Sequence, residues 1–128
     1  MSVTRTQFDI LVDEAWAEVL ERLAPDLRAL AAGVVVNTAL SAGPEQDPDA
    51  EPGESDLLGL YEGVPLVERG ADGDVGLLPD QITVFYKPLV EMCADHDELR
   101  EEIWITLVHE LGHFFGLDED ELWERGFG

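Results

Sequence analysis

Two histidines and a glutamate stand close together near the carboxyl-terminal end of the sequence. They form the run His109-Glu110-Leu-Gly-His113, which uses two of the chain's three histidines. On a helix, residues four apart lie one above the other, so both imidazoles can reach one metal cation. Glu110 lies about 100° around the helix from His109, where a carboxylate can act on a metal-bound water as general base. The spacing therefore predicts metal-assisted hydrolysis, with His109 and His113 as zinc ligands.

A zinc site of this kind needs a third protein ligand. His96 is excluded, because the intervening helix would place it about 20 Å from His109. Gly116 can adopt a left-handed backbone conformation, which would end the helix and return the chain toward the metal. The acidic run that follows this glycine offers three candidates for the third ligand, which are Asp118, Glu119 and Asp120.

A long helix is expected to carry both histidines. Asp95 and Glu98 have the spacing of a capping box at its start, and the periodic pattern continues to about Phe115. One face of this helix is apolar and predicted to enter the core, with Leu99, Ile103, Leu107, Leu111 and Phe114 or Phe115. A separate row along the same helix is polar and contains Glu102, Thr106, His109 and His113. The histidines are therefore expected to face a cleft instead of the core.

The remaining pattern predicts helices and short strands in an α+β order. Apolar residues at three- and four-residue spacing indicate a helix over 8–23, and Pro25 separates it from a short helix over 26–32. Strands are predicted at 34–36, as a short valine run, at 57–64, which ends at Gly63 and Pro65, and at 81–86, which is rich in β-branched and aromatic residues. A short helix is expected over 89–93. A Gly/Asp loop is expected between the last two strands, through Gly70, Gly73 and Gly76. A small sheet packed against helices follows from this order.

Composition narrows the class of protein. The chain of 128 residues has the length of a single domain, 1–128, and its formal net charge is −22. This acidity argues against binding to nucleic acid or to an anionic membrane, since Lys87 is the only lysine. We expect a cytoplasmic protein with no membrane-spanning segment, as a monomer or a homodimer, whose lone Cys93 is buried and inert. The proline- and acid-rich segment 41–56 is predicted to be a mobile loop.

The histidine motif and the residues after it resemble the pattern of a known protein family. His109-Glu-x-x-His113-x-x-Gly116-x-x-Glu119 is similar to the pattern of the bacterial minimal zincins, zincin-like metallopeptidases that lack a Met-turn, except that those have Asp where this chain has Glu119. The resemblance also covers the amino-terminal helix and the stretches that begin at Leu57, Leu78 and Glu98. It implies a minimal zincin-like domain, with a small mixed sheet of about three to four strands and the active-site helix near the carboxyl end.

The resemblance also implies an activity. One zinc ion per chain would be held by His109, His113 and Glu119, with Asp118 or Asp120 as alternates, and Glu110 would be the general base of a peptidase. The substrate would be a peptide or protein lying along an edge strand, for which 82–86 is the candidate. Two other hypotheses are a zincin-like metal-binding or protein-interaction module without turnover, and an acidic interaction protein in which the motif is incidental. Tyr61 and Tyr86 are candidate oxyanion donors, although packing as buried strand tyrosines is the favoured interpretation.

Overall fold

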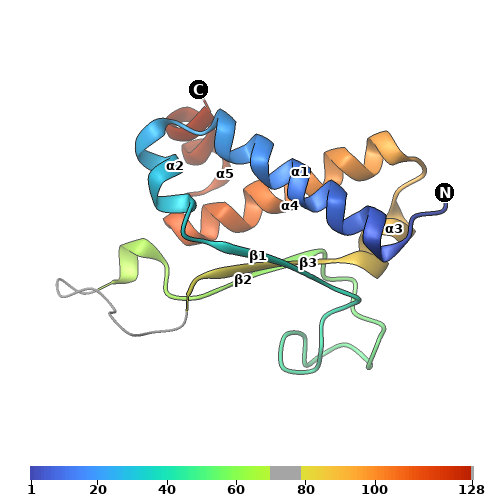
Figure 1. Cartoon of the computed structure of the whole chain (residues 1–128). Coiled ribbons are helices and arrows are strands. Elements are labelled where there is room, and N and C mark those ends of the chain that lie inside the picture. Colours follow the sequence, from blue (N-terminus) through green and yellow to red (C-terminus); the bar gives the residue numbers. More distant parts are fainter. Residues whose placement is uncertain (70–78, 128) are drawn as a thin grey trace.

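The computed structural model describes residues 1–69 and 79–127 of the chain (Figure 1). One small mixed sheet packs against helices, which confirms the α+β class predicted from the sequence. The predicted Gly/Asp loop through Gly70, Gly73 and Gly76 lies outside the described residues. No helix within the described ranges is long and apolar enough to cross a membrane.

Two helices form the amino-terminal part of the chain. Helix α1 (Arg5–Arg22) begins earlier than the apolar pattern predicts, because Thr4 and Gln7 form a capping box. The Thr4 hydroxyl accepts a hydrogen bond from the Gln7 amide, and the Gln7 side chain accepts one from the Thr4 amide. Pro25 is the first residue of helix α2 (Pro25–Ala31), where its missing N–H costs nothing. The helix break predicted at Pro25 is therefore confirmed.

Three strands form the sheet in the order β1-β3-β2. Strand β1 (Val35–Ala39) pairs in parallel with β3 (Gln81–Phe85), and β2 (Gly59–Glu62) pairs with β3 in the antiparallel sense. The prediction that 82–86 forms the edge strand is wrong, because β3 is central and Tyr86 already belongs to the next helix. A β-branched and aromatic run predicts a strand but does not say which segments pair on either side of it, so composition alone could not place β3 at the centre. The edge strand beside the histidine helix is β2.

Helix α3 (Tyr86–Met92) follows β3 directly and leads to the long helix α4 (His96–Phe115). Asp95 caps α4 as predicted, accepting a hydrogen bond from the Glu98 amide at 2.8 Å. The Glu98 side chain reaches the Ala94 amide instead of that of Asp95. Helices α1 and α4 pack against each other on one face of the sheet, as Figure 1 shows. The predicted apolar stripe of α4 is buried in this layer, with Leu99, Ile103, Leu107, Leu111, Phe114 and Phe115.

Three short turns of helix were not predicted. They are η1 (Leu66–Glu68), α5 (Glu119–Leu122) and the π-helical turn η2 (Trp123–Phe127). The ring centroids of Trp123 and Phe127 lie 5.7 and 5.5 Å from that of Trp104 on α4. These contacts pack the carboxyl-terminal turn against the helical layer. Cys93 is buried as predicted, and burial raises the pKa of its thiol, with further contributions from nearby carboxylates.

Segment 41–56 contains turns but neither helix nor strand. Ser55 is buried and donates a hydrogen bond to the Asp47 carboxylate at 2.6 Å. The Lys87 ammonium donates to the carbonyl of Gly53 at 2.9 Å. These bonds join the segment to itself and to α3, whereas its mobility stays a prediction.

Candidate active site

The last turns of α4 bring His109 and His113 together. Their ring centroids are 4.9 Å apart, and their side chains are 49% and 55% exposed. The predicted polar row is only partly correct, because Thr106 is buried beneath β2. The two imidazoles therefore share one accessible surface of the helix, as the four-residue spacing predicts.

Glu110 is buried between the histidines and the edge strand. Its side chain is 8% exposed, and Oε1 accepts a hydrogen bond from the Tyr61 amide of β2 at 2.9 Å. Oε1 also lies 3.3 Å from His113 Nδ1, and Oε2 lies 3.9 Å from His109 Nε2. A buried carboxylate requires such polar partners to offset the loss of hydration. The helix, the strand and both imidazoles therefore fix the orientation of this side chain.

A glycine on β2 permits this close approach of strand and helix. A Cβ atom on Gly59 would lie 2.5 Å from Thr106 Cγ2 and 3.5 Å from Glu110 Cγ. Thr106 cannot easily move aside, because its hydroxyl donates to the Glu102 carbonyl at 2.7 Å. Any side chain at position 59 would therefore push β2 away from α4 and lengthen the bond between Tyr61 and Glu110.

Gly116 ends α4 in the left-handed conformation predicted for it, with φ of 72°. The Leu117 amide then donates to the Gly112 carbonyl at 2.9 Å, which turns the chain back along the helix. This turn places Glu119 Oε1 3.1 Å from His109 Nδ1. Glu119 is thus the acid in this turn that contacts a histidine, and its side chain is 65% exposed.

The two alternates for the third ligand have other positions. Asp118 caps α5, where Oδ1 accepts a hydrogen bond from the Glu121 amide at 2.8 Å. The Glu121 side chain in turn accepts a hydrogen bond from the Asp118 amide, which completes a capping box. Asp120 is exposed in the first turn of α5. The identity of the third ligand stays a prediction, and of the three acids Glu119 is the one that contacts His109 directly.

The side chains have the chemistry of a zinc site without its closed geometry. Two imidazoles and a carboxylate are ligands that zinc prefers. Among residues 1–69 and 79–127, however, no three His, Cys, Asp or Glu side chains converge to hold a metal ion. Glu119 touches the His109 ring itself instead of a point shared by both rings. His109, His113 and Glu119 are therefore of the residue types that bind zinc. The exposed Glu119 side chain would have to rotate before its carboxylate and both imidazoles could reach one metal ion.

A cleft of about 600 Å³ opens beside the two histidines. The α4 surface forms one side, and η1 and the turn into α5 flank it. Its lining is largely apolar and includes Val67, which is 70% exposed. Its ionisable lining residues, apart from the histidines, are acids, namely Glu68, Asp118 and Glu119. The cleft therefore combines apolar walls with negative charge.

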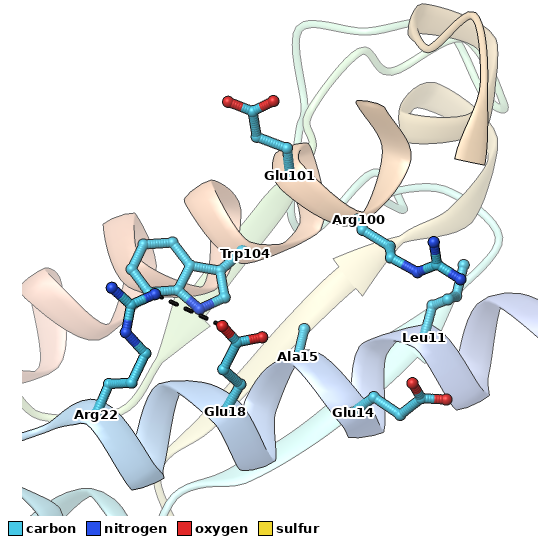
Figure 2. A pocket seen from close by; sticks show the side chains of 8 residues that line it. All are labelled: Leu11, Glu14, Ala15, Glu18, Arg22, Arg100, Glu101 and Trp104. Carbon is cyan, nitrogen blue, oxygen red and sulfur yellow. Dashed lines mark ion pairs between the residues drawn. The ribbon is translucent and has the colours of Figure 1, made fainter. Parts of the chain in front are cut away.

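A second cavity, of about 300 Å³, lies between α1 and α4 and is shown in Figure 2. Arg22 stacks over the Trp104 ring there, with 5.2 Å between the guanidinium carbon and the ring centroid, and pairs with Glu18 at 3.5 Å. None of the residues lining this cavity is a histidine. We therefore assign the candidate chemistry to the end of α4, where the cleft meets a smaller pocket of about 250 Å³ that is lined by His109, Glu110 and Glu119.

Sequence reasoning missed the polar residues that surround Tyr61. The Tyr61 hydroxyl donates to Asp80 Oδ1 at 2.6 Å, and Arg69 Nη2 contacts Asp80 Oδ2 at the same distance. Burial raises the pKa of Tyr61 well above its usual value, as does the Asp80 carboxylate. Burial opposes ionisation of Asp80, but hydrogen bonds from Arg69 and Tyr61 outweigh it and lower the Asp80 pKa. No sequence spacing could have revealed these contacts between separate segments.

Neither tyrosine hydroxyl is placed as an oxyanion donor. The Tyr61 hydroxyl is bound to Asp80, and the Tyr86 hydroxyl donates to the carbonyl of Val3. Tyr86 also packs edge-on against Phe8, with 5.3 Å between ring centroids. Both rings pack against the core, as favoured from the sequence, but each is only partly buried and Tyr86 belongs to α3 instead of a strand.

The chain is similar to known proteins in sequence and in fold. Residues 31–128 match the family model described as zincin-like metallopeptidase. A solved structure described as a conserved hypothetical protein from Thermo thermophilus is similar, with a TM-score of 0.57 and 24% sequence identity, over 88% of this chain and 94% of that one. At this identity, the similarity shows the fold alone. The comparison with curated proteins finds no match. Because the family match covers the sheet, α4 and the histidine turn, the chain belongs to the zincin-like metallopeptidase family.

Proposed function

We propose that the protein is a zinc-dependent peptidase whose general base is Glu110. The observation that carries the proposal is the placement of this buried carboxylate between two exposed histidines at the free edge of β2. His109, His113 and Glu119 would hold the metal. A bound zinc ion supplies Lewis acidity, which lowers the pKa of water and polarises a peptide carbonyl.

Glu110 would take the proton from the attacking water. The Tyr61 amide holds Oε1, which leaves Oε2, on the side of His109, as the oxygen that receives the proton. A fixed carboxylate reacts without first having to reorganise. Burial beneath β2 also limits the access of bulk water to this group. The protein thus contributes orientation and a proton acceptor.

The substrate we propose is an extended peptide along the edge of β2. The Leu58 carbonyl accepts from the Phe85 amide, so Leu58, Leu60 and Glu62 face β3. The backbone groups of Gly59 and the carbonyl of Tyr61 therefore face away from the sheet, where an added strand can pair, whereas the Tyr61 amide is already bound to Glu110. A side chain of this peptide would enter the cleft against Val67.

The test begins with elemental analysis of protein purified without added metal, together with His113→Ala. We expect about one zinc per chain in the parent and loss of zinc in the variant. Hydrolysis of a mixed fluorogenic peptide library is then compared in the parent, Glu110→Gln and the control Glu101→Gln. Glu101 lies on the same helix but lines the other cavity. We expect Glu110→Gln to retain zinc and lose hydrolysis, and Glu101→Gln to retain both.

A second candidate is a zincin-like binding module without turnover. The open arrangement of the donor side chains in the described part of the chain favours it. Under this hypothesis, zinc binds but the library is not cleaved by any variant. Equal hydrolysis in Glu110→Gln and the parent would instead show that the base is wrongly assigned. Absence of zinc on titration would remove both metal-dependent candidates.

A further inference from the structure

Tyr61 connects Glu110 to a polar network that the proposed reaction does not use. The backbone amide of Tyr61 donates to Glu110, whereas its hydroxyl donates to Asp80. Asp80 also pairs with Arg69, whose Nε donates to the Val64 carbonyl at 2.9 Å. One residue is therefore bound at its backbone to the base and at its side chain to an ion pair.

Tyr61, Asp80 and Arg69 form a polar network whose two charged side chains are largely shielded from solvent. The side chains of Arg69 and Asp80 are 30% and 17% exposed, and each Asp80 oxygen has its own donor. Hydrogen bonds that involve a charged partner are stronger than neutral ones. The Arg69 guanidinium also lies over the Phe114 ring, 5.8 Å from its centroid. The network is thus attached to α4 as well as to the segment after β2.

The ring of Tyr61 adds a second attachment to α4. It packs edge-on against Phe114, with 6.0 Å between ring centroids. A Cβ atom on Gly63 would lie 2.3 Å from Asp80 Oδ1 and 2.7 Å from the Tyr61 hydroxyl oxygen. The residue at position 63 must therefore be small for the hydroxyl and the carboxylate to meet. Backbone, ring and hydroxyl together leave Tyr61 little freedom.

We propose that Tyr61, Asp80 and Arg69 are positioning residues for Glu110. Their hydrogen bonds fix the strand segment around residue 61, so that its amide holds the Glu110 carboxylate in one orientation. The inference rests on the proposed role of Glu110 as base. None of the three residues is required to touch the substrate, so their effect on the reaction passes through the amide at position 61.

The two tyrosines of the chain provide a matched pair of variants. Tyr61→Phe removes the hydroxyl that binds Asp80 and keeps the ring against Phe114. Tyr86→Phe removes a hydroxyl that binds the Val3 carbonyl, away from Glu110. Each variant loses one hydrogen bond, so general destabilisation affects both. An effect specific to Glu110 should appear in Tyr61→Phe alone.

The first readout is amide hydrogen exchange in the folded protein, which needs no catalytic activity. We expect Tyr61→Phe to raise exchange at position 61 by about tenfold relative to Leu60, whose backbone faces β3. Tyr86→Phe should leave this ratio unchanged. An unchanged ratio in Tyr61→Phe, or an equal rise at both positions, would overturn the proposal. This result stands even if no peptide is cleaved.

The second readout is a double-mutant cycle on peptide hydrolysis by the zinc-loaded protein. We expect Tyr61→Phe to lower kcat by about tenfold, with KM within about twofold, because a displaced base slows the chemical step. In a Glu110→Gln background, the same change should have no further effect on the residual rate. An additive effect would overturn the proposal. Failure of the parent to hydrolyse any peptide would contradict the proposed function, and the exchange ratio would still decide whether the network fixes the amide.

Discussion

Neighbouring acids in the turn after α4 have different partners. Asp118 accepts a hydrogen bond from a backbone amide and caps α5, whereas Glu119 extends back to His109. The difference follows from the direction of the turn after Gly116, which brings position 119 over the helix surface. The sequence places three acids in a row, and the backbone assigns a separate role to two of them.

Variants of these two acids should separate metal binding from helix capping. We expect Glu119→Ala to weaken zinc binding by at least about tenfold, because it removes a proposed ligand. Asp118→Ala should instead lower the free energy of unfolding by about 1 kcal/mol, the usual cost of losing an N-cap. Calorimetric zinc titration and urea denaturation measure the two effects. Loss of zinc binding in Asp118→Ala but not in Glu119→Ala would show that Asp118, and not Glu119, is the metal ligand.

Asp80 should make stability depend on pH in the acid range. Its pKa is lower in the folded protein than in the unfolded chain, so its stabilising effect is present above the unfolded value and disappears as pH falls through the folded value. We expect Asp80→Asn to lower the free energy of unfolding by about 1–3 kcal/mol near neutral pH, as for other hydrogen bonds to charged groups. The difference from the parent should shrink below about pH 4. Urea denaturation between neutral pH and about pH 3 tests this expectation, and a constant difference would contradict it.

At the scale of elements, the contact between η1 and the end of α4 forms one wall of the cleft. Gly116 has a positive φ, and a Cβ atom there would lie 2.5 Å from Val67 Cγ2. The position therefore excludes other residues both by backbone conformation and by lack of space. The chain also offers a comparison, because Gly53 has φ of 79° and a Cβ atom there would meet nothing within 4 Å.

Alanine at each of these glycines should separate the two causes. We expect Gly53→Ala to lower the free energy of unfolding by about 1–2 kcal/mol through backbone strain alone. Gly116→Ala should cost more, because the added methyl group also displaces Val67. Combining Gly116→Ala with Val67→Ala should recover the excess. Thermal and urea denaturation measure these differences, and equal effects of the two single variants would show that the contact with Val67 is unimportant.

The sequence predicted the long elements and the histidine pair because both follow local rules. The apolar period of α4, its Asp95 cap and the glycine at its end are each encoded within a few residues. The order of strands was not predictable in this way, since pairing joins segments distant in the chain. The same reason hid the contact of Tyr61 with Glu110, which are 49 positions apart. The interpretation of 82–86 as an edge strand failed because composition does not report neighbours.

At the scale of the whole molecule, charge is the dominant surface property. The formal net charge of −22 comes from 29 acidic against 7 basic residues. The cleft repeats this bias, because its lining acids are accompanied by no lysine or arginine among the described residues. A field of this sign attracts cationic ligands over a distance set by the ionic strength.

Peptide hydrolysis should therefore depend on salt in a manner set by substrate charge. We expect kcat/KM for a lysine-containing peptide to fall as sodium chloride rises from about 10 mM to about 500 mM, because salt screens the attraction. A neutral peptide of the same length should change little, and an acidic peptide should be cleaved faster at high salt. Initial rates at fixed zinc concentration measure the three trends. A common salt dependence for all three peptides would rule out electrostatic steering.

The central position of β3 sets an order of events during synthesis. Strands β1 and β2 each pair with β3 and precede it in the chain. Because a ribosome releases the amino-terminal part first, both strands must wait without their partner until Phe85 has emerged. The acid-rich segment 41–56 lies between them during this interval, and its charge discourages association with other nascent chains. The amide that holds Glu110 thus reaches its place only after the sheet has closed and α4 has been made.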